Sequence, residues 1–242
     1  ELARIAELIG HHDAAAEYST VAASVLDAWR TEFLRPDGTI ANESQANLVR
    51  AIAFGLAPEE LHAKVADRLV ELIRDEGTHL GTGFLATPSL LPVLADTGHL
   101  DVAYELLFQH TEPSWLFMLD HGATTVWEQW DGVRADGTTT QSLNHYSKGA
   151  VISFLRRYVA GLQIVEPGYR RFRVAPQPGG GITLARTHHD SPHGRIEVAW
   201  RATRTGGRVK VPVPPGTTAP NAPPGGPARP YDAGRHPMTW TD

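Results

Sequence analysis

Residues 13–33 read DAAAEYSTVAASVLDAWRTEF, and apolar side chains recur in this stretch at every third or fourth position. Residues at this spacing share one face of an α-helix, so the pattern places a single apolar stripe along a helix. The stripe consists of Tyr18, Val21, Ala22, Val25, Leu26, Trp29 and Phe33. We therefore predict a long amphipathic helix over 13–33, which the turn Pro36-Asp37-Gly38 follows.

Helical patterns continue as far as about residue 161. We expect further helices to begin near Glu43, at Pro58 and at Thr87, where Thr87-Pro88 looks like an N-cap and the first helical residue. Other helical segments are expected at about 99–110, 113–121 and 147–160. Because no fixed period with repeated signature residues is visible, a repeat solenoid is disfavoured and a toroidal or antiparallel helical array is favoured.

The periodicity changes after Gly161 from helical to strand-like. Apolar residues alternate with polar ones over 196–203 and again over 209–213, and Thr205-Gly206-Gly207 forms a turn between the two runs. This pattern predicts a β-hairpin over 194–213. Pro and Gly crowd the following residues, 214–230. We place a domain boundary near 161–166 and predict an antiparallel β-sandwich after it.

The composition restricts the classes of protein to which the chain can belong. Of its 242 residues, 41% are hydrophobic and 20% are charged, which is ordinary for a globular protein. A formal charge of -5, with no run of Lys or Arg, predicts no nucleic-acid partner. No apolar stretch reaches the roughly 18 residues of a membrane-spanning helix, so no membrane partner is expected. Zero cysteines exclude disulfides and thiolate metal sites, and are compatible with a cytoplasmic or a secreted location.

The densest cluster of unusual residues lies at 121–132, HGATTVWEQWDG, and 142–146, SLNHY. Here Trp127 and Trp130 bracket Glu128. Aromatic rings make platforms for the apolar faces of sugars, and a carboxylate walled by indoles is partly desolvated, which suits it to acid or base chemistry. Glu128 fits the general base of an inverting glycosidase, in which acid and base flank the bond with room for a water. The competing interpretation is a pair of core tryptophans around a salt-bridged carboxylate.

Several histidines could have either a functional or a purely structural role. On its own, His145 is more often a hydrogen-bonded structural histidine than a ligand. The run from Gly77 to Phe84, which contains His79, is either an active-site loop or a connector, because its glycines permit a close approach of the backbone. The pairs His11-His12 and His188-His189 lack convincing metal spacing, so no metal site is expected.

At these residues the sequence resembles the bacterial α-L-rhamnosidases, glycoside hydrolase family 78. The resemblance spans nearly the whole chain and is specific as an ordered set of runs: HLGTGFLATPSLLPVLAD (79–96), PSW (113–115), HGATTVWEQWDG (121–132), SLNHYSKGA (142–150) and PGYRRFRVAPQPGGG (167–181). It implies a partial (α/α)6 barrel in residues 1–161, followed by a C-terminal β-sandwich in residues 162–242. The implied activity is inverting hydrolysis of terminal α-L-rhamnosides without a cofactor.

The resemblance also implies roles for individual residues. Glu128, the Glu of the Trp-Glu-x-Trp motif, would be the general base, and His145 of the Asn-His-Tyr motif would be a sugar ligand. The expected substrate-binding set is completed by Trp127, Trp130, Asn144 and His79. The expected ligand is a rhamnosylated glycoside or oligosaccharide.

The sequence departs from the family pattern in one respect. The general acid of such enzymes lies in an acidic segment of the first half of the barrel, and nothing in residues 1–30 matches that segment. Residues 1–8 read as a helix already under way and not as a signal peptide. We therefore expect a fragment that supplies the general-base half of the site and is inactive alone. Its expected partner is the missing N-terminal portion of the same polypeptide or a second chain, and its helices should expose a broad apolar face.

Two other functions stay open. One is an (α/α)6 enzyme of other sugar specificity, such as a lyase that acts on uronides, although a Glu between two Trp favours hydrolysis. The other is a non-catalytic carbohydrate-binding or scaffold fragment, in which the aromatic cluster binds sugar and no acid is needed. In each case the tail from about 166 is expected to be structural, because it holds no carboxylate flanked by aromatics.

Overall fold

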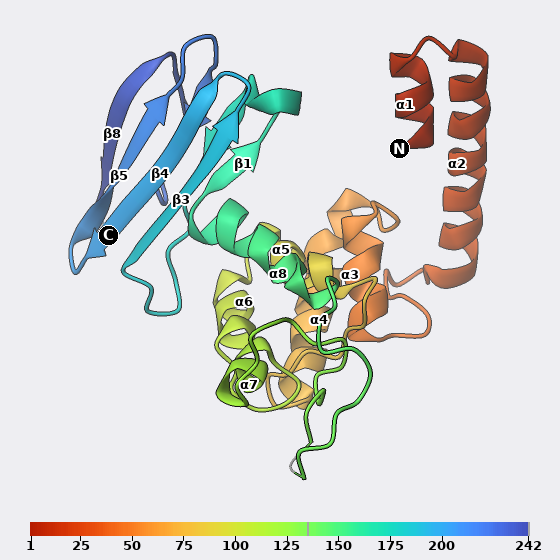
Figure 1. Cartoon of the computed structure of the whole chain (residues 1–242). Coiled ribbons are helices and arrows are strands. Elements are labelled where there is room, and N and C mark those ends of the chain that lie inside the picture. The colour runs from red at the N-terminus through yellow and green to blue at the C-terminus, as the bar shows by residue number, and fades with distance from the viewer. Residues whose placement is uncertain (135, 242) are drawn as a thin grey trace.

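The computed structural model describes residues 1–134 and 136–241, in which a helical part is followed by two β-sheets (Figure 1). The helical part consists of α1 (Leu2–Leu8), α2 (His12–Phe33), α3 (Gln45–Ala53), the 3-10 turn η1 (Glu59–Leu61), α4 (His62–Asp75), α5 (Thr87–Asp96), α6 (Leu100–Leu107), α7 (Trp115–Asp120), the 3-10 turn η2 (Lys148–Ala150), α8 (Val151–Phe154) and the π-helical turn η3 (Leu155–Val159). The helix predicted over 13–33 is confirmed as α2.

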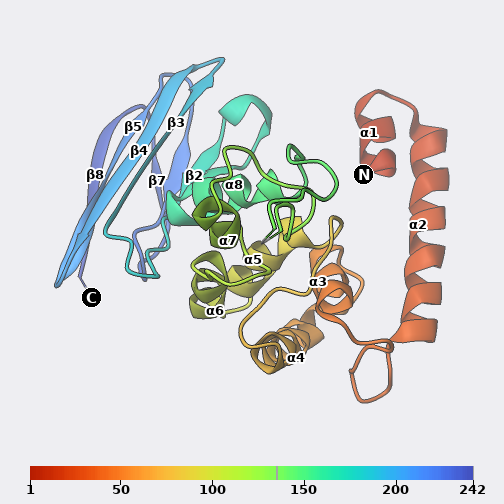
Figure 2. The ribbon, with the colours of Figure 1, turned by 60° about the horizontal axis from the view of Figure 1, so that its bottom comes forward.

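The helices α1 and α2 form a hairpin that stands apart from the other helices (Figures 1 and 2). The C-terminal end of α2 meets them, where the Arg30 Nε donates a hydrogen bond to the Leu56 carbonyl oxygen at 2.9 Å. Most of the apolar stripe is therefore solvent-exposed, and Val25 in its middle is 60% exposed. The apolar face expected from the sequence is present on this hairpin. An apolar surface of this kind is typical of a helix that packs against another segment.

The core of the helical part lies among α3, α4, α5, α6 and α8. In α4, Val65, Leu69 and Ile73 follow one another at four-residue spacing, so one stripe of the helix is buried. The helix α5 is apolar over more of its surface because α3, α6 and α8 all pack against it. The Tyr158 hydroxyl donates to the Asp96 carboxylate at 2.7 Å and ties η3 to the end of α5.

Several predicted helix boundaries differ from the structure. The helix expected to begin at Pro58 starts as the 3-10 turn η1 at Glu59 and becomes α-helical only at His62. Thr87 is the first residue of α5 and not its N-cap, because its hydroxyl bonds back to the Gly83 carbonyl oxygen at 2.9 Å. The segment predicted over 113–121 begins only at Trp115, since the Ser114 hydroxyl accepts the Phe117 N–H at 3.0 Å and caps the helix there. The segment predicted over 147–160 is split into η2, α8 and η3.

The two sheets have four strands each. One has the order β1-β2-β6-β7 and the other β3-β4-β5-β8; the strands are β1 (Leu162–Ile164), β2 (Phe172–Val174), β3 (Leu184–Ser191), β4 (Gly194–Thr203), β5 (Gly206–Val213), β6 (Ala219–Asn221), β7 (Arg229–Tyr231) and β8 (Gly234–Trp240). The hairpin predicted over 194–213 is confirmed as β4–β5. The expectation of a wholly antiparallel sandwich is wrong at one place: β2 and β6 are parallel. A parallel pair needs a long crossover connection, and here β3, β4 and β5 of the other sheet lie in it.

The two parts of the chain share buried contacts. The Trp200 indole N–H on β4 donates to the Val159 carbonyl oxygen at 2.7 Å, and the Tyr104 hydroxyl on α6 donates to the Gln177 carbonyl oxygen at 2.5 Å. These bonds fix the sheets against the end of the helical part (Figure 2). None of the helices described has the length and the apolar character that crossing a membrane requires.

Candidate functional site

The segment 121–146 is a loop, as its lack of periodicity predicted, and its described residues form no helix or strand. Two backbone hydrogen bonds hold its halves side by side. The Glu128 N–H donates to the Ser142 carbonyl oxygen at 2.9 Å, and the His145 N–H donates to the Val126 carbonyl oxygen at 2.8 Å. The Trp-Glu-x-Trp and Asn-His-Tyr runs therefore lie next to each other.

Glu128 is half-buried, and its carboxylate accepts the Ser142 backbone N–H at 3.1 Å. Within the described residues, no Lys, Arg or His side chain forms an ion pair with this carboxylate. The arrangement that the competing interpretation needs, a carboxylate paired with Arg in a closed core, is thus not what the structure has. The carboxylate is oriented by a neutral donor and keeps lone pairs for a further partner.

The two tryptophans of the motif differ in their surroundings. Trp127 is 3% exposed, and a Cβ atom on Gly132 would lie only 2.9 Å from its ring. Its indole is enclosed under the loop and offers no open face to a sugar here. Trp130 is half-buried and packs edge-on against Trp115 of α7, with ring centroids 5.4 Å apart. Both rings fix the path of the loop that carries Glu128.

Lys148 completes this cluster, and no sequence pattern pointed to it, because a single lysine is normally exposed. Its side chain is 2% exposed, and its ammonium donates to the Glu128 backbone carbonyl at 2.5 Å and lies 4.1 Å from the centre of the Trp130 ring. Its own carbonyl accepts the Trp115 indole N–H at 2.9 Å. Burial lowers the pKa of Lys148 to about 8, against the opposing attraction of the Asp131, Glu128 and Glu112 carboxylates.

The lowered pKa of Lys148 predicts a pH dependence of stability. Between about pH 8 and 10.5, the unfolded chain holds a proton on this lysine that the folded chain has lost. The free energy of unfolding of the wild type should therefore rise with pH across this window relative to that of Lys148→Met, which cannot titrate there. Urea denaturation of both proteins at steps of pH measures the difference. Two curves that stay parallel over the window would contradict the prediction.

His145 is half-buried in a stack of rings. Phe84 lies on one side of it, with centroids 4.8 Å apart, and Tyr146 lies next to it at 5.2 Å. The Ser147 N–H donates to His145 Nδ1 at 3.3 Å, so Nε2 carries the proton of the neutral ring and is available as a donor. Tyr146 is 87% exposed. Phe84 and Tyr146 were not among the predicted site residues, although they provide the exposed aromatic surface here.

Asn144 is exposed next to His145, and only its backbone is held, by two hydrogen bonds of 3.1 Å with the Ser142 hydroxyl. Its side-chain amide has no hydrogen-bond partner among residues 1–134 and 136–241. The His79 ring has other partners: its nitrogens bond to the Glu76 carbonyl at 2.9 Å and to the Thr111 hydroxyl at 2.7 Å. No hydrogen bond among the described residues joins it to Glu128 or His145. Its loop does reach the site through Phe84.

Two family models match the chain. The model for the bacterial alpha-L-rhamnosidase six-hairpin glycosidase domain matches residues 1–159. The model for the bacterial alpha-L-rhamnosidase C-terminal domain matches residues 161–226.

Named relatives agree with these models. An alpha-L-rhamnosidase of Streptomyces avermitilis is 41% identical over 221 residues, which is 90% of this chain and 21% of that protein. One from Formosa agariphila is 34% identical over 223 residues, 90% of this chain and 24% of that protein. The chain thus spans between a fifth and a quarter of the length of these relatives.

Solved structures show the same architecture. The Streptomyces avermitilis alpha-L-rhamnosidase, solved in complex with L-rhamnose, superposes with a TM-score of 0.92 at 37% identity over 98% of this chain and 25% of that one. The Aspergillus terreus alpha-L-rhamnosidase also gives a TM-score of 0.92, at 31% identity over 98% of this chain and 28% of that one.

Proposed function

Because the chain belongs to the bacterial α-L-rhamnosidase family, we propose that it is part of a glycoside hydrolase that releases terminal α-L-rhamnose. One observation carries this proposal: the Glu128 carboxylate is held by the Ser142 N–H and forms no ion pair among the described residues, and backbone hydrogen bonds hold its half of the loop against the half that carries His145. A carboxylate in this setting can accept a proton beside a surface suited to a sugar.

The proposed architecture is a partial (α/α)6 barrel in residues 1–161 joined to a β-sandwich domain in residues 162–242. The exposed apolar stripe of the α1–α2 hairpin supports this proposal, because such a face is suited to packing against further helices of a barrel. The proposed partner for this face is the rest of the barrel, in the same polypeptide or in a second chain.

In the proposed mechanism Glu128 is the general base. It takes a proton from a water molecule, and the oxygen of that water attacks the anomeric carbon while the glycosidic bond breaks on the opposite face. A general acid protonates the leaving oxygen, and we place this acid outside the 242 residues. An inverting pair of carboxyl groups needs a separation of roughly 6.5–9.5 Å to admit the water. The loop bonds that fix Glu128 would keep this spacing constant.

The proposed sugar-binding residues divide into two groups. His145 and Asn144 offer polar groups, an imidazole N–H and an amide, on the open side of the loop. Trp130 and Trp127 act mainly through the shape of the loop, since both are partly or wholly enclosed. His79 is proposed to act through the loop that carries Phe84 against His145.

The proposal is tested by the hydrolysis of an aryl α-L-rhamnoside by the complete enzyme that contains this chain, with the released anomer followed by NMR. Release of β-L-rhamnose as the first product is expected, and α-L-rhamnose as the first product would refute inversion. Calorimetric titration of L-rhamnose into the 242-residue chain tests the alternative of a binding or scaffold fragment. Binding by the chain together with an inactive complete protein would favour that alternative.

His145→Ala is expected to raise KM for the aryl rhamnoside by about tenfold or more, together with any fall in kcat, because a sugar ligand contributes in both the ground and the transition state. Steady-state kinetics on the complete enzyme measures both constants. His193→Ala, an exposed histidine in the β3–β4 turn, is the matched control and should leave KM unchanged. A lower melting temperature with an unchanged KM would assign His145 a structural role instead.

A further inference from the structure

The β-sheet part carries a charge opposite to that of the helical part. Residues 162–242 contain eleven Lys and Arg against five Asp and Glu, which is a formal charge of +6. Residues 1–161 contain eleven Lys and Arg against twenty-two Asp and Glu, which is a formal charge of -11. The net charge of -5 for the whole chain is therefore the sum of an acidic helical part and a basic β-sheet part.

Six of these cations lie on one face of the sheet β3-β4-β5-β8. Along β4, Ile196, Val198 and Trp200 are buried, so the residues between them point to the solvent side. The strand pairings extend this alternation to the neighbouring strands. We call the result the basic face; its cations are Arg186, Arg195, Arg201, Arg208, Lys210 and Arg235, and its carboxylates are Asp190 and Glu197.

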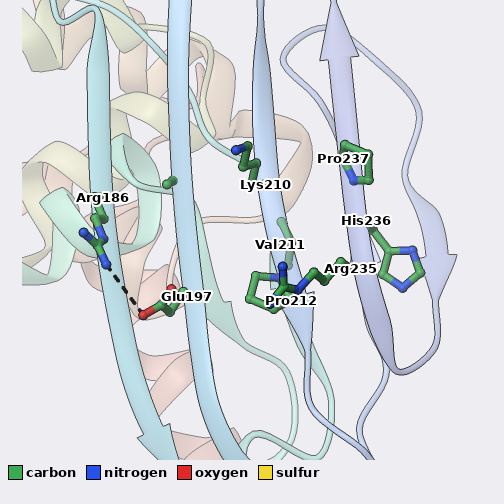
Figure 3. A pocket seen from close by; sticks show the side chains of 9 residues that line it. Arg186, Glu197, Lys210, Val211, Pro212, Arg235, His236 and Pro237 are labelled. Atoms are coloured by element: carbon green, nitrogen blue, oxygen red, sulfur yellow. Dashed lines mark ion pairs between the residues drawn. The ribbon is translucent and has the colours of Figure 1, made fainter.

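The basic face contains an open depression of about 540 Å³ (Figure 3). Arg186, Ala199 and Lys210 are direct neighbours across β3, β4 and β5. Because the side chain of Ala199 is only a methyl group, it forms the bottom of the depression, between the longer side chains of Arg186 and Lys210. Pro212 and Pro237 border the same depression on β5 and β8. A polar ligand lying across the strands could therefore meet cations on both sides.

The charges on this face are not balanced among themselves. Glu197 holds Arg195 at 3.1 Å and Arg186 at 3.7 Å. Arg201 and Arg208, in contrast, stand directly opposite each other on adjacent strands, and like charges so placed destabilise a sheet. Neither they nor Lys210 and Arg235 form an ion pair within the described residues.

Protection of a sheet edge does not explain this arrangement. Charged side chains such as Lys often lie on the edge strands of sheets, where they prevent pairing with another chain and hence aggregation. Here Arg201, Arg208 and Lys210 lie on β4 and β5, which are the two central strands. Local arrangements that cost stability are expected at functional sites. The surplus of positive charge matches an anionic ligand.

We propose that the basic face binds an anionic polysaccharide that carries carboxylate or sulfate groups. Arginine binds such groups through two parallel N–H donors. A nucleic acid fits less well, because no Phe, Tyr or Trp side chain of the described strands lies on this face to stack on bases. A polysaccharide also fits the glycosidase family of the chain, since a second site on one polymer raises its effective concentration at the first.

The proposed binding site lies in the tail, for which the sequence predicted a purely structural role. It leaves the expectation of no catalytic residue there untouched. It rests on family membership for the class of ligand and is independent of the role of Glu128. Loss of binding at the basic face and loss of rhamnoside hydrolysis can therefore be observed separately.

The test measures the affinity of the full chain by calorimetry at 0.15 M salt, near physiological ionic strength. The ligands are polygalacturonate for carboxylate, dextran sulfate for sulfate, neutral dextran, and duplex DNA. The double variant Arg208→Glu/Lys210→Glu reverses two cations of the face. Arg204→Glu/Arg229→Glu is the matched control, because it changes the charge equally in the β4–β5 turn and on β7 of the other sheet. If the first variant does not fold, Arg208→Gln/Lys210→Gln takes its place.

We expect the chain to bind polygalacturonate or dextran sulfate and not dextran, and the ligand that binds identifies the acidic group. The basic-face variant should weaken binding by on the order of tenfold or more, since it removes charge-assisted contacts, while the control changes it little. No binding to either acidic polysaccharide would overturn the proposal. So would an equal loss in the control variant, or binding of DNA as tight as that of the polysaccharide.

Discussion

Replacing Glu128 by Gln is expected to lower kcat of the complete enzyme by more than the roughly 10²–10⁴-fold that a general base usually contributes. The amide keeps the shape of the side chain and can still accept the Ser142 N–H. It cannot take the proton from the attacking water, and it also positions that water less well, which adds to the loss. The dissociation constant of L-rhamnose, measured by calorimetry, should change by only about twofold, because the sugar contacts remain.

A chemical rescue separates catalysis from structure at this position. In Glu128→Ala, added azide is expected to attack the anomeric carbon in place of water, because azide needs no base and the space of the side chain is free. The product would be a rhamnosyl azide of inverted configuration, while the aglycone leaves with a proton from the general acid. Glu166→Gln, a carboxylate of an exposed ion pair with Arg171, controls for the loss of a negative charge and should leave kcat unchanged. An active Glu128→Gln enzyme would remove Glu128 from the mechanism.

The helices and the hairpin were predictable because their signals are local. The stripe in α2 and the alternation in β4 and β5 both reflect which neighbours along the chain share a face. The stripe alone could not show what it packs against, and in the structure most of it is exposed. The turn itself was predicted slightly out of place: it lies at Arg204 and Thr205, whereas Gly206 and Gly207 already belong to β5 and pair with Thr203 and Ala202.

The surroundings of Glu128 could be predicted only in part. The motif singled out Glu128 and His145, but the residues that hold them come from distant positions: Lys148 is twenty residues away from Glu128, and Phe84 reaches His145 from another loop. For Trp127, the sequence suggested a role that its surroundings in the structure do not support. Its residue type indicated a sugar platform, whereas its burial depends on Gly132, whose lack of a side chain makes room for the indole.

The basic face could not be predicted from the sequence either, because its residues are far apart in the chain. Its cations are spread over residues 186–235, and no two of them are adjacent in the chain. Pairing of four strands brings them onto one surface, where a run-based search for Lys and Arg finds nothing. The overall charge of -5 pointed away from any basic site, because the acidic helical part outweighs the basic sheets.

Gly161→Ala is expected to destabilise the protein by about 3–5 kcal/mol or to prevent folding, as substitutions that force a backbone clash in a buried position do. Gly161 lies where the helical part meets β1, has φ of +85°, and its carbonyl accepts the Ala175 N–H at 2.9 Å. A Cβ atom here would lie 2.3 Å from the Pro176 nitrogen and 2.7 Å from the Ala175 carbonyl carbon. Both are backbone atoms of the strand connection, so no side-chain rotation relieves the clash.

Gly168→Ala separates this clash from the cost of the left-handed backbone. Gly168 also has a positive φ, +71°, but apart from its own residue and its two chain neighbours no described atom lies within 4 Å of the position of its Cβ. Its substitution should cost only the roughly 1–2 kcal/mol that a residue with a Cβ loses in this conformation. Urea denaturation of both variants measures the difference in the free energy of unfolding. If Gly161→Ala gives no soluble, cooperatively unfolding protein while Gly168→Ala does, the clash is severe enough to prevent folding, which also supports the prediction. Equal losses at the two glycines would show that backbone conformation, and not the contact with residues 175 and 176, sets the requirement for glycine at the junction.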